Sequence, residues 1–145
     1  MRLVLDTDVP VAALRSDRGA SRQLLLRALE GDFHVLISVP LLIEYEAVLT
    51  RPEHLEPSGL NAMEVNAILD ALAKVATRVH LRFLWRPRLK DPADEMVLET
   101  AVNGMADRLV TFNQRHLAAA ASDFGIRALT PREMWKEFRR LDEKD

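Results

Sequence analysis

Cysteine is absent from this chain of 145 residues. Its absence excludes disulfide bonds, thiolate metal ligands and cysteine nucleophiles. Histidine is scarce as well, and its four copies lack the spacing of a zinc site; they are His34, His54, His80 and His116. A metal site in this protein is therefore expected to use oxygen ligands, which suit Mg²⁺ or Mn²⁺.

The chain also lacks a strong excess of either charge, with 20 Lys and Arg residues against 22 Asp and Glu residues and a formal net charge of −2. Nucleic-acid-binding proteins usually carry a basic footprint, so the bulk charge gives no support to that function, although the distribution of charge matters more than the sum. No apolar run is long enough to cross a membrane, and Asp6 interrupts the first apolar run too early for a signal peptide. We expect a cytoplasmic protein without a membrane partner.

No internal repeat, low-complexity segment or linker divides the chain, so we expect a single domain over residues 1–145. Short apolar segments alternate with helical patterns, which predicts an α/β fold with a mainly parallel central sheet of about five strands flanked by helices. The predicted strands cover residues 3–5, 33–37, 79–84, 109–111 and 126–129. The stretch RPEHLEPSG, residues 51–59, is expected to be a loop because two prolines and a glycine punctuate it.

Two aspartates, Asp6 and Asp8, follow the first predicted strand directly in MRLVLDTDVP. Either the strand ends in an ordinary polar loop, or it delivers carboxylates to a site at its carboxyl end, where ligands bind in open α/β sheets. If the strand at 109–111 lies beside the first one, Thr111 and Asn113 emerge next to these aspartates. Asn113 after a strand is otherwise a common turn residue.

Two further carboxylates, Glu44 and Asp94, lie on helical faces that carry apolar residues. Glu44 shares a face with Leu41, Tyr45 and Val48 in SVPLLIEYEAVLT. A salt bridge or a position at the edge of this stripe would explain it, and metal ligation is the alternative if other carboxylates converge. Asp94 shares a face with Leu98, Ala101 and Met105 near a helix start, whereas the adjacent Glu95 is expected to face solvent.

Three separate segments thus place Asp6, Glu44 and Asp94 at a strand end or on an inward helical face, which predicts a shared Mg²⁺ or Mn²⁺ site. The basic stretch LRFLWRPRLK, residues 81–90, contains Arg82, Arg86, Arg88 and Lys90. These side chains are candidates for contacts with nucleic-acid phosphates, with Arg115 as another, although a solvated strand end would show the same composition.

The order and spacing of these motifs resemble the PIN-domain ribonucleases, particularly the toxins of VapC-type toxin–antitoxin pairs. LVLDTDV is similar to the family's first-strand motif, whose aspartate is a metal ligand. SVPLLIEYEAVLTRP places Glu44 at the second acidic position, and DPADEMVLETAVNGMADRLVTFNQRHL places Asp94 at the third. The ending ALTPREMW is also similar to endings in this group. Many relatives carry asparagine at the position of Asp8 and aspartate at that of Asn113, so one carboxylate has moved across the pocket under this interpretation.

The resemblance implies a PIN-like three-layer fold and an endoribonuclease that hydrolyses RNA phosphodiester bonds with Mg²⁺ or Mn²⁺. It implies Asp6, Glu44, Asp94 and Asn113 as catalytic residues, the first three as metal ligands, and Asp8 and Thr111 as residues that complete the pocket. It also implies a cognate antitoxin as partner, and we expect a homodimer.

Two alternatives to this function remain at the level of sequence. LDTDV also resembles the haloacid-dehalogenase phosphatase motif, in which the first aspartate is a nucleophile and the second a general acid. The short chain and the lack of an ordered downstream set of one lysine and paired aspartates argue against it. The other alternative is a catalytically weak PIN-like module that binds RNA or an antitoxin. The helical faces at residues 20–30 and 60–75 are candidates for contact with an antitoxin or a second copy, or belong wholly to the core.

Overall fold

A computed structural model describes residues 1–82 and 91–144 of the chain. Its centre is a five-stranded sheet in which all neighbouring strands are parallel, in the order β3-β2-β1-β4-β5. The strands are β1 (Arg2–Leu5), β2 (His34–Ile37), β3 (Thr77–Arg78), β4 (Arg108–Val110) and β5 (Arg127–Leu129). β1 is the central strand and its Leu3, Val4 and Leu5 are at most 1% exposed, as expected for a strand covered on both faces.

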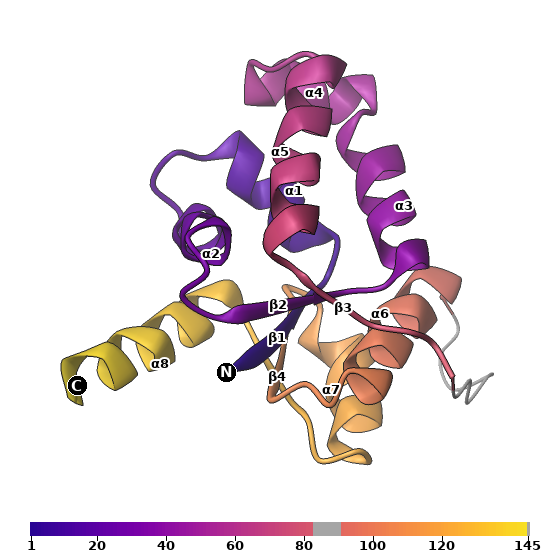
Figure 1. The fold of residues 1–145 in the computed structure, drawn as a ribbon, viewed down its shortest axis with the longest axis vertical. Coiled ribbons are helices and arrows are strands. Elements are labelled where there is room, and N and C mark those ends of the chain that lie inside the picture. Colours follow the sequence, from indigo (N-terminus) through magenta and orange to yellow (C-terminus); the bar gives the residue numbers. More distant parts are fainter. Residues whose placement is uncertain (83–90, 145) are drawn as a thin grey trace.

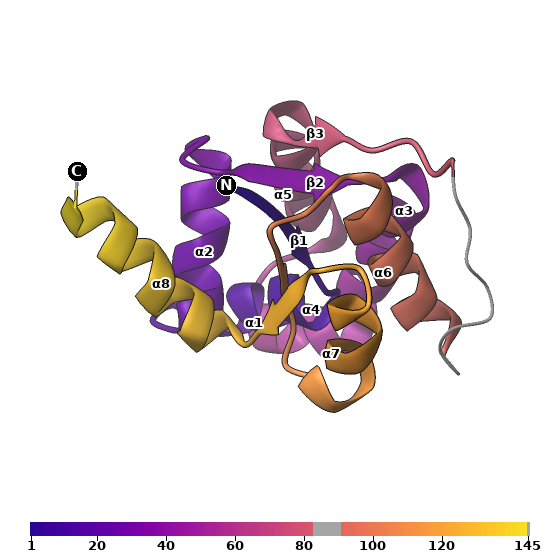
Figure 2. The same ribbon diagram turned by 90° about the horizontal axis from the view of Figure 1, so that it is seen from below.

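Helices cover both faces of this sheet and produce three layers (Figure 1). α1, α2 and α5 lie on one side, and α6 and α7 lie on the other, as the view from below also shows (Figure 2). The bounds are α1 (Asp8–Arg15), α2 (Ala20–Leu29), α3 (Val39–Leu49), α4 (Pro52–Ser58), α5 (Ala62–Val75), α6 (Pro92–Asn103), α7 (Gln114–Ser122) and α8 (Pro131–Lys144). The α/β fold with a parallel sheet of five strands is thereby confirmed.

Side-chain caps explain where several of these helices begin. The Ser38 hydroxyl accepts a hydrogen bond from the Leu41 amide at the start of α3, and the Asp91 carboxylate accepts one from Ala93 at the start of α6. At the start of α8, Thr130 and Glu133 satisfy each other's backbone amides, which is the capping box that the sequence TPRE predicts. These caps supply acceptors to amides that the helices themselves leave unpaired.

The last helix, α8, packs against α2 through aromatic side chains. Trp135 stacks on Phe138, with ring centroids 6.1 Å apart, and Phe138 meets Phe33 edge to face at 5.7 Å. The Arg27 guanidinium of α2 lies over both rings of α8, 5.7 and 5.8 Å from their centroids. The C-terminal segment is therefore bound to the body of the molecule (Figure 2).

Two local predictions are wrong. Residues 51–59 were expected to be a loop, but Pro52–Ser58 forms α4, because Pro52 occupies the first turn, where proline needs no amide partner, and Gly59 ends the helix with a φ of 72°. The third strand was expected at residues 79–84, whereas β3 covers only Thr77–Arg78, and residues 83–84 lie outside the described part. In the described residues, no helix is long and apolar enough to cross a membrane.

Candidate active site

The carboxyl end of β1 places Asp6 at the middle of the sheet edge. The Asp6 amide still follows the strand and donates to the carbonyl of Val110 at 2.8 Å, so the side chain emerges where β1 and β4 end together. One carboxylate oxygen accepts from the Thr7 amide at 2.8 Å and the other from the Thr111 hydroxyl at 2.7 Å. Asp6 is 8% exposed and is held in one orientation by these two hydrogen bonds.

Thr111 follows β4 and contacts Asp6, which follows β1, as the sequence predicts if these two strands are neighbours. Its hydroxyl donates to Asp6 and accepts a hydrogen bond from the Asn113 amide at 2.8 Å. Asn113 is half-buried and precedes α7 directly. The predicted proximity of Thr111 to Asp6 is therefore confirmed, and Asn113 follows at the same edge of the sheet.

Asp8 begins α1 and is only partly exposed. Its Oδ1 atom is buried and has no hydrogen-bond partner among residues 1–82 and 91–144. Burial and then the negative charge of Asp6 raise the pKa of Asp8 from 3.8 to about 7, and Asp94 adds a smaller effect in the same direction. Asp8 thus belongs electrostatically to the same site as Asp6 and Asp94.

Asp94 lies in the first turn of α6 and is 7% exposed, so the predicted inward orientation is confirmed. Burial raises its pKa, and the negative charges of Asp6 and Asp91 raise it further, whereas the nearby His116 of α7 lowers it. Asp91 also raises the pKa of Asp6, after burial as the main cause. Asp91, which the sequence indicates only as a helix cap, is therefore an electrostatic neighbour of the site as well.

The prediction that Glu95 faces solvent is wrong, because Glu95 is 5% exposed. Glu99, one helical turn later, is 2% exposed and was not recognised from the sequence. The sequence contains a signal that could have identified Glu99, because Asp91, Glu95 and Glu99 recur at a spacing of four and so form one row along α6. Both buried glutamates have interaction partners.

α3 brings Tyr45 to the sheet edge, whereas no contact joins its neighbour Glu44 to Asp6 or Asp94 within the described residues. Tyr45 is fully buried and its hydroxyl donates a short hydrogen bond to the carbonyl of Leu5, directly before Asp6. Burial, followed by the charges of Asp6 and Asp8, raises the pKa of Tyr45 well above its ordinary value, so the phenol remains a donor. Glu44 is half-buried at the edge of the apolar stripe of α3.

A buried pair of hydroxyl groups connects α3 with α6. The Ser38 and Thr100 hydroxyl oxygens lie 2.7 Å apart, and Thr100 also donates to the carbonyl of Met96 at 2.8 Å. Because a hydroxyl has one proton, Ser38 is the donor in the contact between the two helices. This contact fixes the helix that carries Glu44 relative to the helix that carries Asp94.

The donor chemistry of this edge fits a divalent cation. Asp6, Asp8 and Asp94 oppose one another's ionisation, and a buried carboxylate oxygen of Asp8 lacks a partner in the part of the chain that the structure describes. A bound cation would relieve both costs, and carboxylate oxygens are ligands that Mg²⁺ and Mn²⁺ accept. Within residues 1–82 and 91–144, however, no three or more His, Asp or Glu side chains are gathered closely enough to hold a metal ion. The joint ligand role of Asp6, Glu44 and Asp94 therefore stays a prediction.

The residues predicted to contact RNA divide into three groups. Arg82 is exposed at the end of the first described segment, and its amide donates to Asn103 Oδ1 at 3.0 Å. Arg86, Arg88 and Lys90 lie outside the described residues. Arg115 lies in the first turn of α7 with an exposed side chain, two residues after Asn113. Its placement close in sequence to the site residues is compatible with a contact to a bound phosphate.

Comparison with known proteins adds one finding to this geometry. A family model described as PIN domain matches residues 2–115, a segment that contains Asp6, Glu44, Asp94 and Asn113. No curated protein is similar enough to the chain to match it. The matched segment ends within α7 and leaves β5 and α8 beyond it.

Proposed function

Because the chain belongs to the PIN domain family, we propose that it is a metal-dependent endoribonuclease that hydrolyses phosphodiester bonds in RNA. PIN domains are generally metal-dependent nucleases, so the family implies a hydrolase of this broad class. The observation that supports the proposal for this chain is the placement of Asp6 at the joint carboxyl end of β1 and β4, held by Thr111 and electrostatically coupled to Asp8 and Asp94. Family membership gives no support to the alternative of a haloacid-dehalogenase-like phosphatase.

In this proposal Asp6 and Asp94 hold Mg²⁺ or Mn²⁺, with Glu44 as the third acidic residue. The cation, when bound, would stabilise negative charge on the phosphate and promote attack by water. Asp8, Thr111 and Asn113 complete the pocket. The absence of cysteine agrees with hydrolysis that needs no thiol nucleophile.

The chain's own residues would act mainly by orientation. The Thr7 amide and the Thr111 hydroxyl each hold one oxygen of Asp6, which restricts rotation of its carboxylate. Tyr45 holds the backbone at Leu5, and the Ser38–Thr100 contact holds α3 against α6. A preoriented site avoids the cost of ordering these groups during the reaction.

The direct test is cleavage of a labelled single-stranded RNA by the purified protein with Mg²⁺ or Mn²⁺. We expect cleavage that stops with EDTA and falls at least a hundredfold in Asp6→Asn. Asp70→Asn is the matched control, because it removes the same charge from an exposed position of α5. Activity that survives EDTA or Asp6→Asn would contradict the proposed mechanism. RNA binding without cleavage, together with no Mn²⁺ binding by calorimetry, would favour a catalytically weak binding module.

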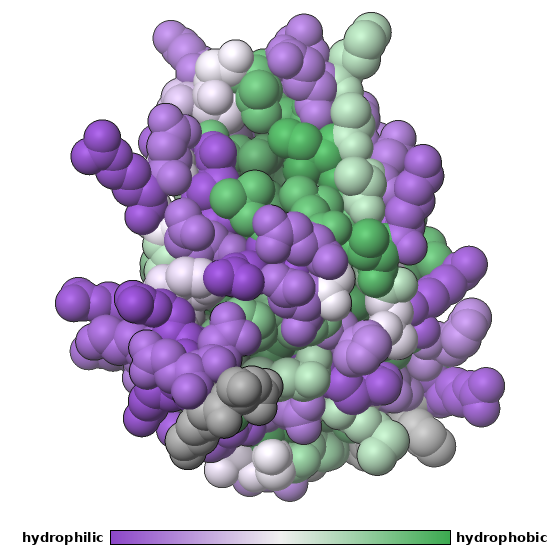
Figure 3. Space-filling model, turned by 60° about the vertical axis from the view of Figure 1, so that its left-hand side comes forward, coloured by the Kyte–Doolittle hydropathy of each residue, from purple (hydrophilic) through white to green (hydrophobic). Residues whose placement is uncertain are grey.

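We also propose that the protein acts as the toxin of a toxin–antitoxin pair, with a cognate antitoxin protein as partner, and that it forms a homodimer. The supporting feature is a set of exposed apolar side chains on α2 and α5, and the space-filling view shows apolar side chains gathered on one face of the molecule (Figure 3). Leu26 of α2 is 43% exposed, and Met63 and Val75 of α5 are 81% and 41% exposed. Exposed apolar patches of this kind are typical of protein contacts.

The dimer is tested by the molar mass in light scattering after gel filtration. We expect a dimer for the wild type and a monomer for Leu26→Glu, and a wild-type monomer at every concentration would contradict the proposed dimer. The toxin role is tested by expression in bacteria, where we expect growth arrest by the wild type and none by Asp6→Asn.

A further inference from the structure

A pocket of about 340 Å³ lies at the edge of the sheet where the start of β1, the end of β3 and the end of α6 meet. Its lining includes four cationic or titratable basic side chains, Arg2, Arg78, His80 and Arg82, together with Asn103 and Gly104. We propose that this pocket binds a backbone phosphate of the RNA strand, at a distance from the carboxylates around Asp6. The proposal rests on the proposed function, because it assigns a second contact to the same substrate.

The walls of the pocket are fixed by contacts between segments far apart in the sequence. Arg2 Nε donates to the Gly104 carbonyl at 2.9 Å, and the Arg82 amide donates to Asn103 Oδ1 at 3.0 Å. A Cβ atom on Gly104 would lie 2.8 Å from both Leu36 Cδ1 and Val79 Cγ2, so α6 approaches the sheet more closely here than a side chain would allow. The basic side chains are therefore presented from a rigid framework.

The charge of the pocket is not neutralised by its lining. No Asp or Glu belongs to the lining residues, and Arg78 and Arg82 are exposed and form no salt bridge within the described part of the chain. The Asp107 carboxylate lies beside this pocket and accepts a hydrogen bond from the Arg2 amide at 2.7 Å. By contrast, Arg108 is paired with Glu137 at 2.8 Å, so arginine–carboxylate pairing occurs elsewhere in this fold.

This arrangement favours a phosphate over other ligands. Guanidinium groups offer forked donors that match phosphate oxygens, and phosphate contacts position a nucleic acid without reading its sequence. The carbonyl end of α6 would by itself disfavour an anion, but Arg2 covers the Gly104 carbonyl. In a chain with a net charge of −2, unpaired arginines gathered in one pocket form a local basic footprint that the total charge conceals.

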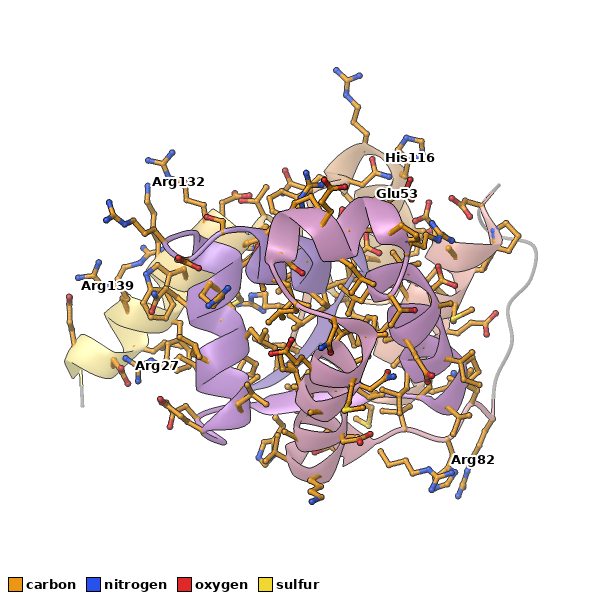
Figure 4. The ribbon with its side chains drawn as sticks, turned by 90° about the horizontal axis from the view of Figure 1, so that it is seen from above. Arg27, Glu53, Arg82, His116, Arg132 and Arg139 are labelled. Carbon is orange, nitrogen blue, oxygen red and sulfur yellow. The ribbon has the colours of Figure 1, made fainter. Side chains whose placement is uncertain are left out.

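The pocket and the carboxylates are separated both along β1 and across the sheet. Arg2 and Asp6 are four residues apart, which corresponds to roughly 13 Å in a strand. Arg78 pairs with Ile37 and is thus level with Leu5, but β3 lies two strands away from β1, roughly 10 Å across the sheet. His116, whose charge acts on Asp94, and Arg82 lie at different ends of the molecule in Figure 4. One phosphate cannot reach both sites, but a strand of several nucleotides can. The contribution of the pocket should therefore increase with the length of the RNA.

The test is fluorescence anisotropy with labelled single-stranded RNAs of two lengths, a trinucleotide and a 12-mer, in EDTA to prevent cleavage. For the double variant Arg78→Glu, Arg82→Glu we expect at least tenfold weaker binding of the 12-mer. We also expect a smaller salt dependence: the slope of the log association constant against log salt concentration should be less steep by about 1 to 2. Each lost phosphate contact removes roughly 0.7 from that slope. The affinity for the trinucleotide should fall less than threefold in this variant.

The matched control is Arg139→Glu, Arg140→Glu on α8, which makes the same change in net charge on exposed residues. Arg139 lies on the opposite side of the molecule from Arg82 (Figure 4), and Arg140 follows it directly in α8. We expect this control to bind the 12-mer within threefold of the wild type, with circular dichroism confirming that both variants are folded. Equal losses in the two double variants, or no loss in the pocket variant, would overturn the proposal.

Inorganic phosphate and a nucleoside monophosphate distinguish a strand from a small ligand. If either binds with the same dependence on Arg78 and Arg82 while RNA length has no effect, the assignment to an RNA strand is wrong. Cleavage with Mn²⁺ is measured separately. Binding that depends on the pocket without any cleavage would remove the nuclease proposal alone, whereas cleavage without dependence on the pocket would remove the pocket proposal alone.

Discussion

Replacing Asp8 by asparagine should stabilise the metal-free protein near neutral pH. Asp8 carries a buried oxygen that has no partner among the described residues, and its negative charge faces those of Asp6 and Asp94. An asparagine side chain has nearly the same shape and no charge, so the repulsion and most of the cost of burying the charge disappear. The gain should depend on pH, because Asp8 itself becomes neutral in acid.

The sign and size of this gain in stability follow from the raised pKa of Asp8, which is about 7 in the folded protein against an ordinary 3.8. Between these pH values the folded state binds more protons at Asp8 than the unfolded state does, so the free energy of unfolding falls as the pH rises. A difference of about three pH units corresponds to about 4 kcal/mol. Because Asp8 is partly exposed and solvent screens its charge, we expect about half of that value, ~2 kcal/mol.

The measurement is urea denaturation of wild type and Asp8→Asn in EDTA at pH 4.5, 6 and 7.5, with the slope against urea checked for constancy. The variant should be more stable than the wild type by ~2 kcal/mol at pH 7.5, and this difference should shrink as the pH approaches 4.5. Asp70→Asn is the control for a general loss of negative charge, and it should show no comparable dependence on pH.

Two results would refute this reasoning. One is a variant that is no more stable than the wild type at pH 7.5, and the other is a difference that stays constant from pH 4.5 to 7.5. Millimolar Mn²⁺ provides an independent check, because a cation at this edge should stabilise the wild type more than it stabilises Asp8→Asn.

Three further substitutions test the supports of the site. Tyr45→Phe removes the donor to the buried Leu5 carbonyl, and thermal or urea denaturation should show a loss of about 1–3 kcal/mol. Thr111→Val removes a hydroxyl that bonds to both Asp6 and the Asn113 amide; it should cost about 1–3 kcal/mol in urea denaturation and lower RNA cleavage more strongly than Tyr45→Phe does. Gly104→Ala places a methyl group 2.8 Å from two side chains of the sheet region. The melting temperature should therefore fall, with a loss of about 1–3 kcal/mol in the free energy of unfolding. An unchanged melting temperature would show that α6 shifts freely.

The central strands and most helix starts are predictable from the sequence because their signals are local. The apolar run before Asp6 predicts a buried strand, and Ser38, Asp91 and the Thr130–Glu133 pair predict helix starts. The proximity of Thr111 to Asp6 required one topological assumption, that β4 lies beside β1, and this assumption is confirmed.

The errors have two causes, an ambiguous local signal and packing between segments that are distant in the sequence. Proline and glycine at residues 51–59 resemble a loop, yet the same residues suit the two ends of a short helix. Glu95 lies on a helix face that looks polar in sequence, but the assembled fold buries it at 5% exposure. Arg82 is a candidate phosphate contact from the sequence, but its place in a pocket with Arg2 and Arg78 could not be predicted, because the walls come from three separated segments.

The strand β5 has a consequence for how much of the chain the fold requires. It lies beyond residue 115, where the family match ends, yet it pairs with β4 and its Leu129 carbonyl accepts from the Thr111 amide at 2.9 Å. A chain shortened at residue 115 would leave the outer hydrogen-bonding groups of β4 open to water. Such an unprotected strand edge is a template for β-pairing with other molecules. A shortened protein is thus expected to aggregate, even though it would retain all the carboxylates proposed to hold the metal.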